Sequence, residues 1–91
     1  MGCVMVTVYL SGVSVKQREI IYTSLMERNW MKLTEPGDGT DTVWYCFFDN
    51  AISEAASKET AANDFKNCTR GCCRPKLAIH WGPNQPLFMG L

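Results

Sequence analysis

The amino-acid sequence predicts an α+β domain in which a four-stranded antiparallel sheet carries two helices on one face. Segments with the two-residue alternation of strands and segments with the helical 3.6-residue period follow one another as strand, helix, strand, strand, helix, strand. The 91 residues, 46% of them hydrophobic and 20% charged, are enough for one hydrophobic core and too few for two. We therefore expect a single domain over residues 1–91.

A first strand is predicted over residues 3–10, which read CVMVTVYL and combine β-branched residues with strict alternation. The side of this strand that would face the core consists of Val4, Val6, Val8 and Leu10. The other side carries Met5, Thr7 and Tyr9. Cys3, and Cys46 later in the chain, alternate within strands and are predicted to be core residues.

Ser14 and Gln17 have the spacing of a capping box, in which each side chain binds the backbone N–H of the other residue at the start of a helix. The pattern that follows predicts a helix over residues 15–28, packed on the sheet through Ile21 and Leu25. The residues expected to widen this apolar stripe are Ile20, Tyr22 and Met26.

Residues 30–34 are predicted to form a short second strand, and residues 42–48 (TVWYCFF) a third strand that is apolar on both faces. Between them, Pro36 and Gly37 suit the two central positions of a type II turn, so residues 35–41 are expected to be a hairpin loop. A second helix is predicted over residues 51–66, with Asp49 or Asn50 as its N-cap. Its thin apolar stripe would consist of Ile52, Ala55, Ala56, Ala62 and Phe65.

A loop over residues 67–75 leads to a fourth strand over residues 76–81, and residues 82–91 form an apolar C-terminal tail. Right-handed crossovers assemble this order of elements into an antiparallel sheet with strand order 4-1-3-2. The first and third strands are then central, in agreement with their apolar sequences. The expected architecture is a ferredoxin-like βαββαβ two-layer sandwich with both helices on one face.

The formal net charge is zero, so no global field attracts the chain to nucleic acid or to an anionic membrane. No apolar run approaches the roughly 18 residues that a membrane span needs, and residues 1–10 lack the basic start of a signal peptide. Five cysteines without such a signal favour free thiols over a disulfide framework. We therefore expect a cytoplasmic protein without a membrane partner.

Cysteine and histidine are the residue types that invite a catalytic or metal interpretation. Adjacent cysteines cannot easily both bind one tetrahedral zinc ion, so no metal site is predicted, although a metal on Cys68, Cys72 and Cys73 stays open. Neighbouring antiparallel strands would permit Cys3 to face the single histidine, His80, but no oxyanion loop or orienting carboxylate accompanies the pair, so an ordinary hydrogen bond of His80 is the preferred interpretation. We predict no catalytic residue, no cofactor and no enzyme.

Two charged patches of opposite sign are predicted. The hairpin loop is acidic through Glu35, Asp38 and Asp41. The stretch over residues 66–76 has no carboxylate and is basic through Lys66, Arg70, Arg74 and Lys76. A dipolar protein without net charge selects its partners by charge complementarity, so the basic stretch is a candidate surface for either a protein or a nucleic acid.

Residues 8–13 (VYLSGV) resemble the first signature of RNA-recognition motif domains, with Tyr9 where that family stacks a base. Tyr45 and Phe47 fit aromatic positions of the second signature, whereas Asp41 and Thr42 stand near the places of its basic residue and glycine. The resemblance implies a sheet face that binds RNA or another single strand. Exposed aromatic residues are equally expected at a dimer or partner interface.

Residues 6–33 are similar to the small ferredoxin-like nucleases of CRISPR adaptation and to related antitoxin ribonucleases. In those nucleases an Asp near the end of the first strand helps to bind metal, whereas Leu10, Ser11 and Gly12 occupy that place here. The resemblance therefore implies a degenerate nuclease or antitoxin rather than a metal-dependent phosphodiesterase.

A domain with opposite charge patches, an aromatic sheet face and no catalytic set is expected to act by binding. The leading hypothesis is a small inhibitor or regulator of a protein complex, similar in size and character to phage-encoded anti-defence proteins such as anti-CRISPR proteins. Binding of RNA or single-stranded nucleic acid is the alternative, and a homodimer is a further option. The predicted partner-binding residues are Tyr9, Tyr45, Phe47, Arg70, Arg74 and Lys76.

Overall fold

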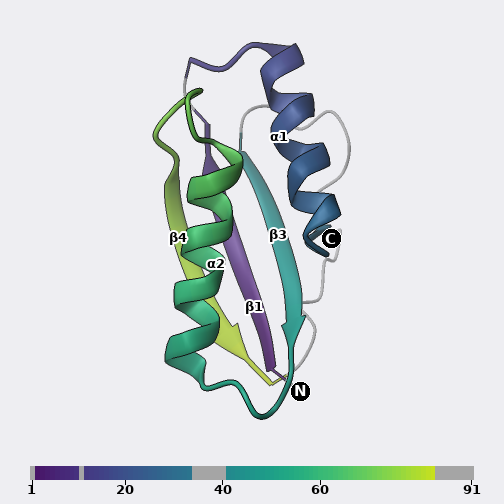
Figure 1. Ribbon diagram of the computed structural model, residues 1–91, viewed down its shortest axis with the longest axis vertical. Helices are drawn as coiled ribbons and strands as arrows, with labels where there is room; N and C mark the ends of the chain where they lie inside the picture. Colours follow the sequence, from purple (N-terminus) through teal and green to yellow (C-terminus); the bar gives the residue numbers. More distant parts are fainter. Residues whose placement is uncertain (1, 11, 34–40, 84–91) are drawn as a thin grey trace, which may run out of the picture.

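The computed structural model describes residues 2–10, 12–33 and 41–83. Its elements are, in order, β1 (Gly2–Tyr9), α1 (Val15–Glu27), β2 (Met31–Lys32), β3 (Asp41–Phe48), α2 (Glu54–Cys68) and β4 (Lys76–Gly82). The strands form one antiparallel sheet in the order β2-β3-β1-β4, and both helices lie on the same side of it (Figure 1). The predicted α+β class, with a four-stranded antiparallel sheet and two helices, is thus confirmed. The observed order is the sequence 4-1-3-2 read from the opposite edge.

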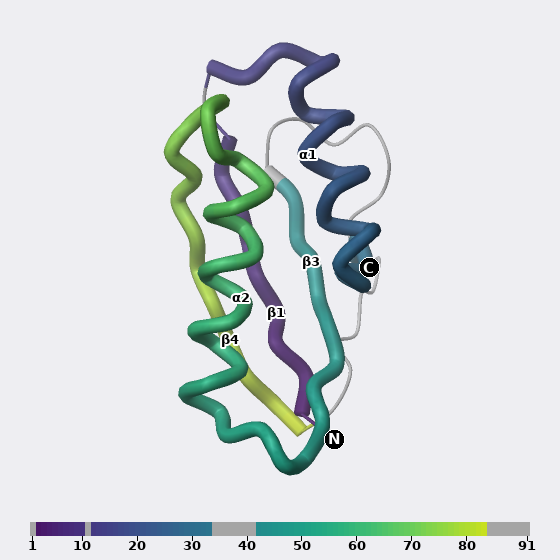
Figure 2. The backbone as a smooth tube through the Cα atoms, in the orientation of Figure 1, coloured from purple at the N-terminus to yellow at the C-terminus, as the bar shows by residue number. Residues whose placement is uncertain are grey.

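Strand β1 lies in the middle of the sheet, between β3 and β4 (Figure 2). Its pairs with β3 run from Gly2 opposite Phe48 to Tyr9 opposite Asp41. Its pairs with β4 run from Cys3 opposite Gly82 to Tyr9 opposite Lys76. Because residues directly opposite each other share a face, this register decides which side chains meet on each side of the sheet.

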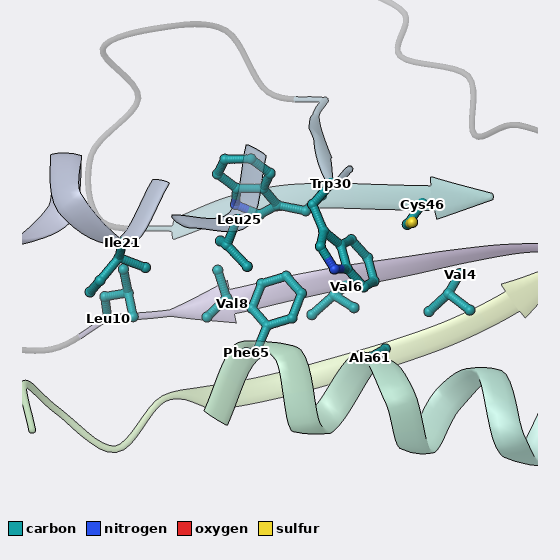
Figure 3. Packing of buried hydrophobic residues seen from close by; sticks show 11 residues of the cluster. Val4, Val6, Val8, Leu10, Ile21, Leu25, Trp30, Cys46, Ala61 and Phe65 are labelled. Carbon is teal, nitrogen blue, oxygen red and sulfur yellow. The ribbon is translucent and has the colours of Figure 1, made fainter. Parts of the chain in front are cut away.

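The hydrophobic core fills the space between the sheet and the two helices (Figure 3). The four residues predicted to face the core from the first strand, Val4, Val6 and Val8 of β1 and Leu10 directly after it, are buried. The helices contribute buried residues at Ile21, Leu25, Ala61 and Phe65. Trp30, just before β2, is also buried and meets the ring of Phe65 edge-on, with 4.9 Å between the ring centroids.

Helix α1 begins with the predicted capping box. The backbone N–H of Gln17 donates to Ser14 Oγ at 3.1 Å, and the backbone N–H of Ser14 donates to Gln17 Oε1 at 3.1 Å. The apolar stripe is narrower than predicted, because Ile20 and Met26 remain 59% and 55% exposed. The helix ends at Glu27, and the chain reverses through Asn29, whose φ of 68° is left-handed.

The predicted start of α2 is wrong. The N-cap is Ser53, whose Oγ accepts the backbone N–H of Ala56 at 3.1 Å, while Asp49 Oδ1 accepts the N–H of Ala51 in a turn before the helix. The buried positions are Ser57, Ala61 and Phe65, so of the predicted stripe only Phe65 is fully buried, Ala62 is half-buried, and Ile52, Ala55 and Ala56 are exposed. A buried serine is tolerated here because its hydroxyl donates to the carbonyl of Ser53 at 2.9 Å. No helix in the described ranges has the length and apolar character needed to cross a membrane.

Strand β2 is shorter than the predicted segment over residues 30–34. It spans Met31–Lys32, which pair with Tyr45 and Trp44. One further bond, from the N–H of Leu33 to the carbonyl of Val43 at 2.7 Å, continues the contact with β3. Most of the predicted hairpin loop, including Glu35 and Asp38, and residues 84–91 of the predicted tail lie outside the described residues.

The far end of β4 is positioned by a close contact with the start of β1. A Cβ atom added to Gly2 would lie 2.7 Å from Trp81 Nε1, so the absence of a side chain lets the indole lie against the β1 backbone. Trp81 nevertheless stays 37% exposed, because it lies at the edge of the sheet.

Candidate binding face

The sheet has one face without helices, which we call the open face. The register places on it Cys3, Met5, Thr7 and Tyr9 of β1, Val43, Tyr45 and Phe47 of β3, Met31 of β2, and Lys76, Ala78 and His80 of β4. The three aromatic residues predicted for this face therefore lie on it. Tyr9 is 45% exposed and Phe47 is 38% exposed.

The aromatic residues do not form one continuous platform. Tyr45 and Phe47 contact each other edge-on, with ring centroids 5.8 Å apart. Tyr45 lies opposite Met5, whereas Tyr9 lies opposite Asp41, four residues further along β1. Four residues of a strand span about 13 Å, so Tyr9 is outside ring contact with the other two. The resemblance to RNA-recognition motif domains implies one aromatic surface. Here the three aromatic residues are instead divided between two ends of the open face.

The two ends have different chemistry. At one end, Met31 is 38% exposed and lies opposite Tyr45, which places it beside the Tyr45–Phe47 pair. At the other end, Lys76 lies directly opposite Tyr9. Sequence reasoning missed Met31, since the short β2 gave no clear alternation. It did select Lys76 and Tyr9, but it did not predict that these two residues are neighbours.

The basic loop, which we define as residues 69–76, joins α2 to β4. Arg70, Arg74 and Lys76 are exposed, and none of them forms an ion pair with a described carboxylate. The loop backbone is held by Thr69, whose carbonyl accepts the N–H groups of Cys72 at 3.0 Å and Cys73 at 3.2 Å. The buried Thr69 hydroxyl in turn donates to the carbonyl of Phe65 at 2.8 Å. The loop therefore presents its charges from an anchored backbone next to the Tyr9 end of the open face.

The cysteines of this region are half-buried free thiols. Cys68, Cys72 and Cys73 pack against the edge of the hydrophobic core. Burial raises the pKa of the Cys73 thiol, and the neighbouring Cys72 raises it further. Within the ranges that the structure describes, no three His, Cys, Asp or Glu side chains come together in a group able to hold a metal ion.

The pairing of Cys3 with His80, which neighbouring strands would permit, is not observed. Cys3 lies opposite Gly82, and His80 lies opposite Met5, so the two residues are displaced by two positions along the strands. Cys3 is only 2% exposed, and burial raises the pKa of its thiol. A buried, protonated thiol is a weak nucleophile. Cys3 and Cys46 are both buried, as predicted for core residues. Cys46 belongs to the hydrophobic cluster between the sheet and the helices, whereas the register places Cys3 on the open face, opposite Phe47.

A comparison with known proteins finds no family model, no curated protein and no solved structure that matches this chain. The interpretation of the open face and the basic loop therefore depends on their geometry and chemistry.

Proposed function

We propose that this chain is a non-enzymatic binding protein that inhibits or regulates a macromolecular complex. The observation that carries the proposal is the exposure of apolar and aromatic side chains on the open face, at Tyr9, Met31 and Phe47. Exposed apolar side chains gathered on one face are typical of protein interaction sites, and aromatic residues and Met are enriched in them. The neighbouring basic loop would add charge complementarity to an acidic partner surface.

Several finer assignments belong to the same proposal. The order of elements and of strands supports a ferredoxin-like fold. Five free cysteines among the described residues support a reducing, cytoplasmic location. The small size and the exposed aromatic residues of the open face support the hypothesis of a phage-type anti-defence protein. The open face and the basic loop, with Tyr9, Tyr45, Phe47, Arg70, Arg74 and Lys76, are the proposed partner-binding surface.

The test compares matched surface variants in affinity capture from a bacterial lysate, read by quantitative mass spectrometry. We expect the wild-type chain to retain a stoichiometric protein complex, and Phe47→Ser to lose it. The matched control is Ile20→Ser, which changes an equally apolar exposed residue on α1, in the other layer. Loss of the same complex with both variants, or retention with both, would contradict binding through the open face.

A second candidate function, binding of single-stranded nucleic acid, is favoured by one observation. Lys76 and Tyr9 are direct neighbours on the open face, so a base stacked on Tyr9 would have a cation within reach of its phosphate. Fluorescence polarisation with short RNA and DNA would then show binding that weakens steeply with salt. Tyr9→Ala would weaken binding at all salt concentrations, while Lys76→Gln would also reduce the salt slope by about one. Absence of binding at low salt would exclude this function.

A further inference from the structure

Strand β4 forms one edge of the sheet and has an unpaired outer side. It is seven residues long and, among the described strands, pairs with β1 alone, whereas the opposite edge strand β2 has two residues. No backbone hydrogen bond joins the outer side of β4 to another described residue. Since strand residues alternate in the direction of their backbone groups, every second residue of β4 directs outward an N–H and a C=O that no described residue binds.

Strand β4 also lacks the features that usually prevent edge pairing. Its only charged residue, Lys76, is the first residue of the strand, and no proline interrupts the strand. On its helix-facing side Leu77 and Ile79 are only half-buried, and Trp81 is 37% exposed. An edge of this kind is complementary to another strand that brings apolar side chains to the same side.

We propose that two copies of this chain associate by antiparallel pairing of β4 with β4, about a twofold axis at Ile79. In this register Ile79 lies opposite itself and Leu77 lies opposite Trp81 of the other copy, so apolar side chains meet on the helix-facing side. On the open face, Ala78 lies opposite His80 of the other copy. Lys76 lies opposite Gly82, so no like charges meet across the pair. The product is a continuous eight-stranded sheet.

The position of α2 fits this arrangement. Figure 1 shows α2 above the part of the sheet that contains β1 and β4. If α2 lies midway between these strands, a strand spacing of about 4.8 Å places the two α2 helices about 10 Å apart across the axis, a normal helix-packing distance. Figure 3 shows Val6 between Phe65 and Ala61, and Val6 lies opposite Ile79. The middle of the segment 61–65 is therefore level with the proposed axis.

The outer side of α2 has complementary residues at matching levels. Asp64 faces α1, because it binds Arg28 and Trp30. With 100° per residue, the opposite side of the helix carries Ala55, Glu59, Ala62 and Lys66. The alanines allow close approach of two helices. In an antiparallel pair centred between residues 62 and 63, Glu59 lies level with Lys66 of the other copy, and neither forms an ion pair with a described residue of its own chain.

Charge exchange at these two positions tests the interface by sedimentation of the isolated chain, without any partner. We expect a dimer whose association is weakened about five- to tenfold by Glu59→Lys, because two contacts become repulsive. The double variant E59K/K66E restores opposite charges and should restore association. The two positions are seven residues apart on one helix, about 10 Å along its axis, so an ion pair within one chain does not explain such a rescue. A monomer at every concentration, an unaffected dimer, or a double variant that stays dissociated would overturn the proposal.

Hydrogen exchange gives a second, independent readout of the same interface. On raising the protein concentration, alternate amides of β4 should become protected, since their N–H groups would then bind the other copy. Glu59→Lys should remove this concentration dependence while leaving the amides of β1 unchanged. Concentration-dependent protection confined to any other strand would overturn the proposal.

Discussion

The carboxylate of Asp64 on α2 accepts the indole N–H of Trp30 at 3.0 Å. Its other oxygen accepts the guanidinium of Arg28 at 3.3 Å, so one side chain ties α2 to the segment between α1 and β2. Trp30 is 1% exposed, so its indole N–H depends on Asp64 for a hydrogen-bond acceptor. The Arg28 side chain is 45% exposed, and such an ion pair contributes little to stability.

Asp64→Ala is expected to lower the free energy of unfolding by about 1–3 kcal/mol, because it leaves the buried indole donor without an acceptor. Asp64→Asn keeps an oxygen at the same place and should cost less. Urea denaturation measures both. Arg28→Gln is the control, with an expected loss of less than about 1 kcal/mol. An equal loss for Arg28→Gln and Asp64→Ala would show that the ion pair, and not the indole bond, is the stabilising contact.

A second buried indole depends on a threonine. Trp44 Nε1 donates to Thr42 Oγ1 at 2.8 Å, and both residues are almost completely buried in β3. Thr42→Val keeps the shape of the side chain but removes the acceptor, so we expect a loss of about 1–3 kcal/mol in urea denaturation. Thr42→Ser retains the hydroxyl and should be the more stable of the two variants. The reverse order would contradict the importance of this hydrogen bond.

The sequence was most informative where a local pattern is matched by the tertiary structure. The alternation of Val4, Val6 and Val8 identified β1 and its buried side, because both helices cover that side. The capping box of Ser14 and Gln17 is a purely local interaction, and it was predicted correctly. The length of β2 was overestimated. The strand has two residues, because its length depends on pairing with its partner, β3.

Other features of the fold and of the open face could not be read from sequence alone. The sequence identified Tyr9, Tyr45 and Phe47, and these residues share one face. Their separation depends on the register between β1 and β3, which no local pattern specifies. In α2, the buried Ser57 interrupts the apolar pattern, so the predicted stripe included the exposed Ala55 and Ala56 and omitted Ala61.

The start of α2 provides a third prediction. Ser53 Oγ accepts the backbone N–H of Ala56, so Ser53→Ala is expected to lower the free energy of unfolding by about 1 kcal/mol. Asn50→Ala is the matched control. Asn50 is exposed and makes no side-chain hydrogen bond to a described residue, so its replacement should be close to neutral. Thermal denaturation, monitored by circular dichroism, compares the stabilities of the two variants. A larger effect of Asn50→Ala would instead place the N-cap where sequence reasoning expected it.

The buried thiols of Cys3 and Cys46 predict how stability depends on pH. Burial raises the pKa of each thiol above its ordinary value of 9.0, and the charge of Asp64 raises that of Cys46 further. Below about pH 8 both thiols are protonated in the folded and the unfolded chain, so they cause no pH dependence there. Above the ordinary value the unfolded chain loses these protons before the folded chain does, and the free energy of unfolding falls as the pH rises through the folded pKa. Urea denaturation under reducing conditions at about pH 7 and about pH 10 measures this loss.

The double variant C3A/C46A isolates the contribution of these thiols, since tyrosines and lysines also titrate in the alkaline range. It should be less stable than the wild type at neutral pH, because it removes two buried sulfur atoms from the interior. Its free energy of unfolding should nevertheless fall less between neutral and alkaline pH. Cys72→Ala is the control, because it removes a half-buried thiol of the basic loop that is not buried in the sheet. If C3A/C46A loses as much stability at alkaline pH as the wild type does, then the thiols of β1 and β3 are not the groups that link folding to pH.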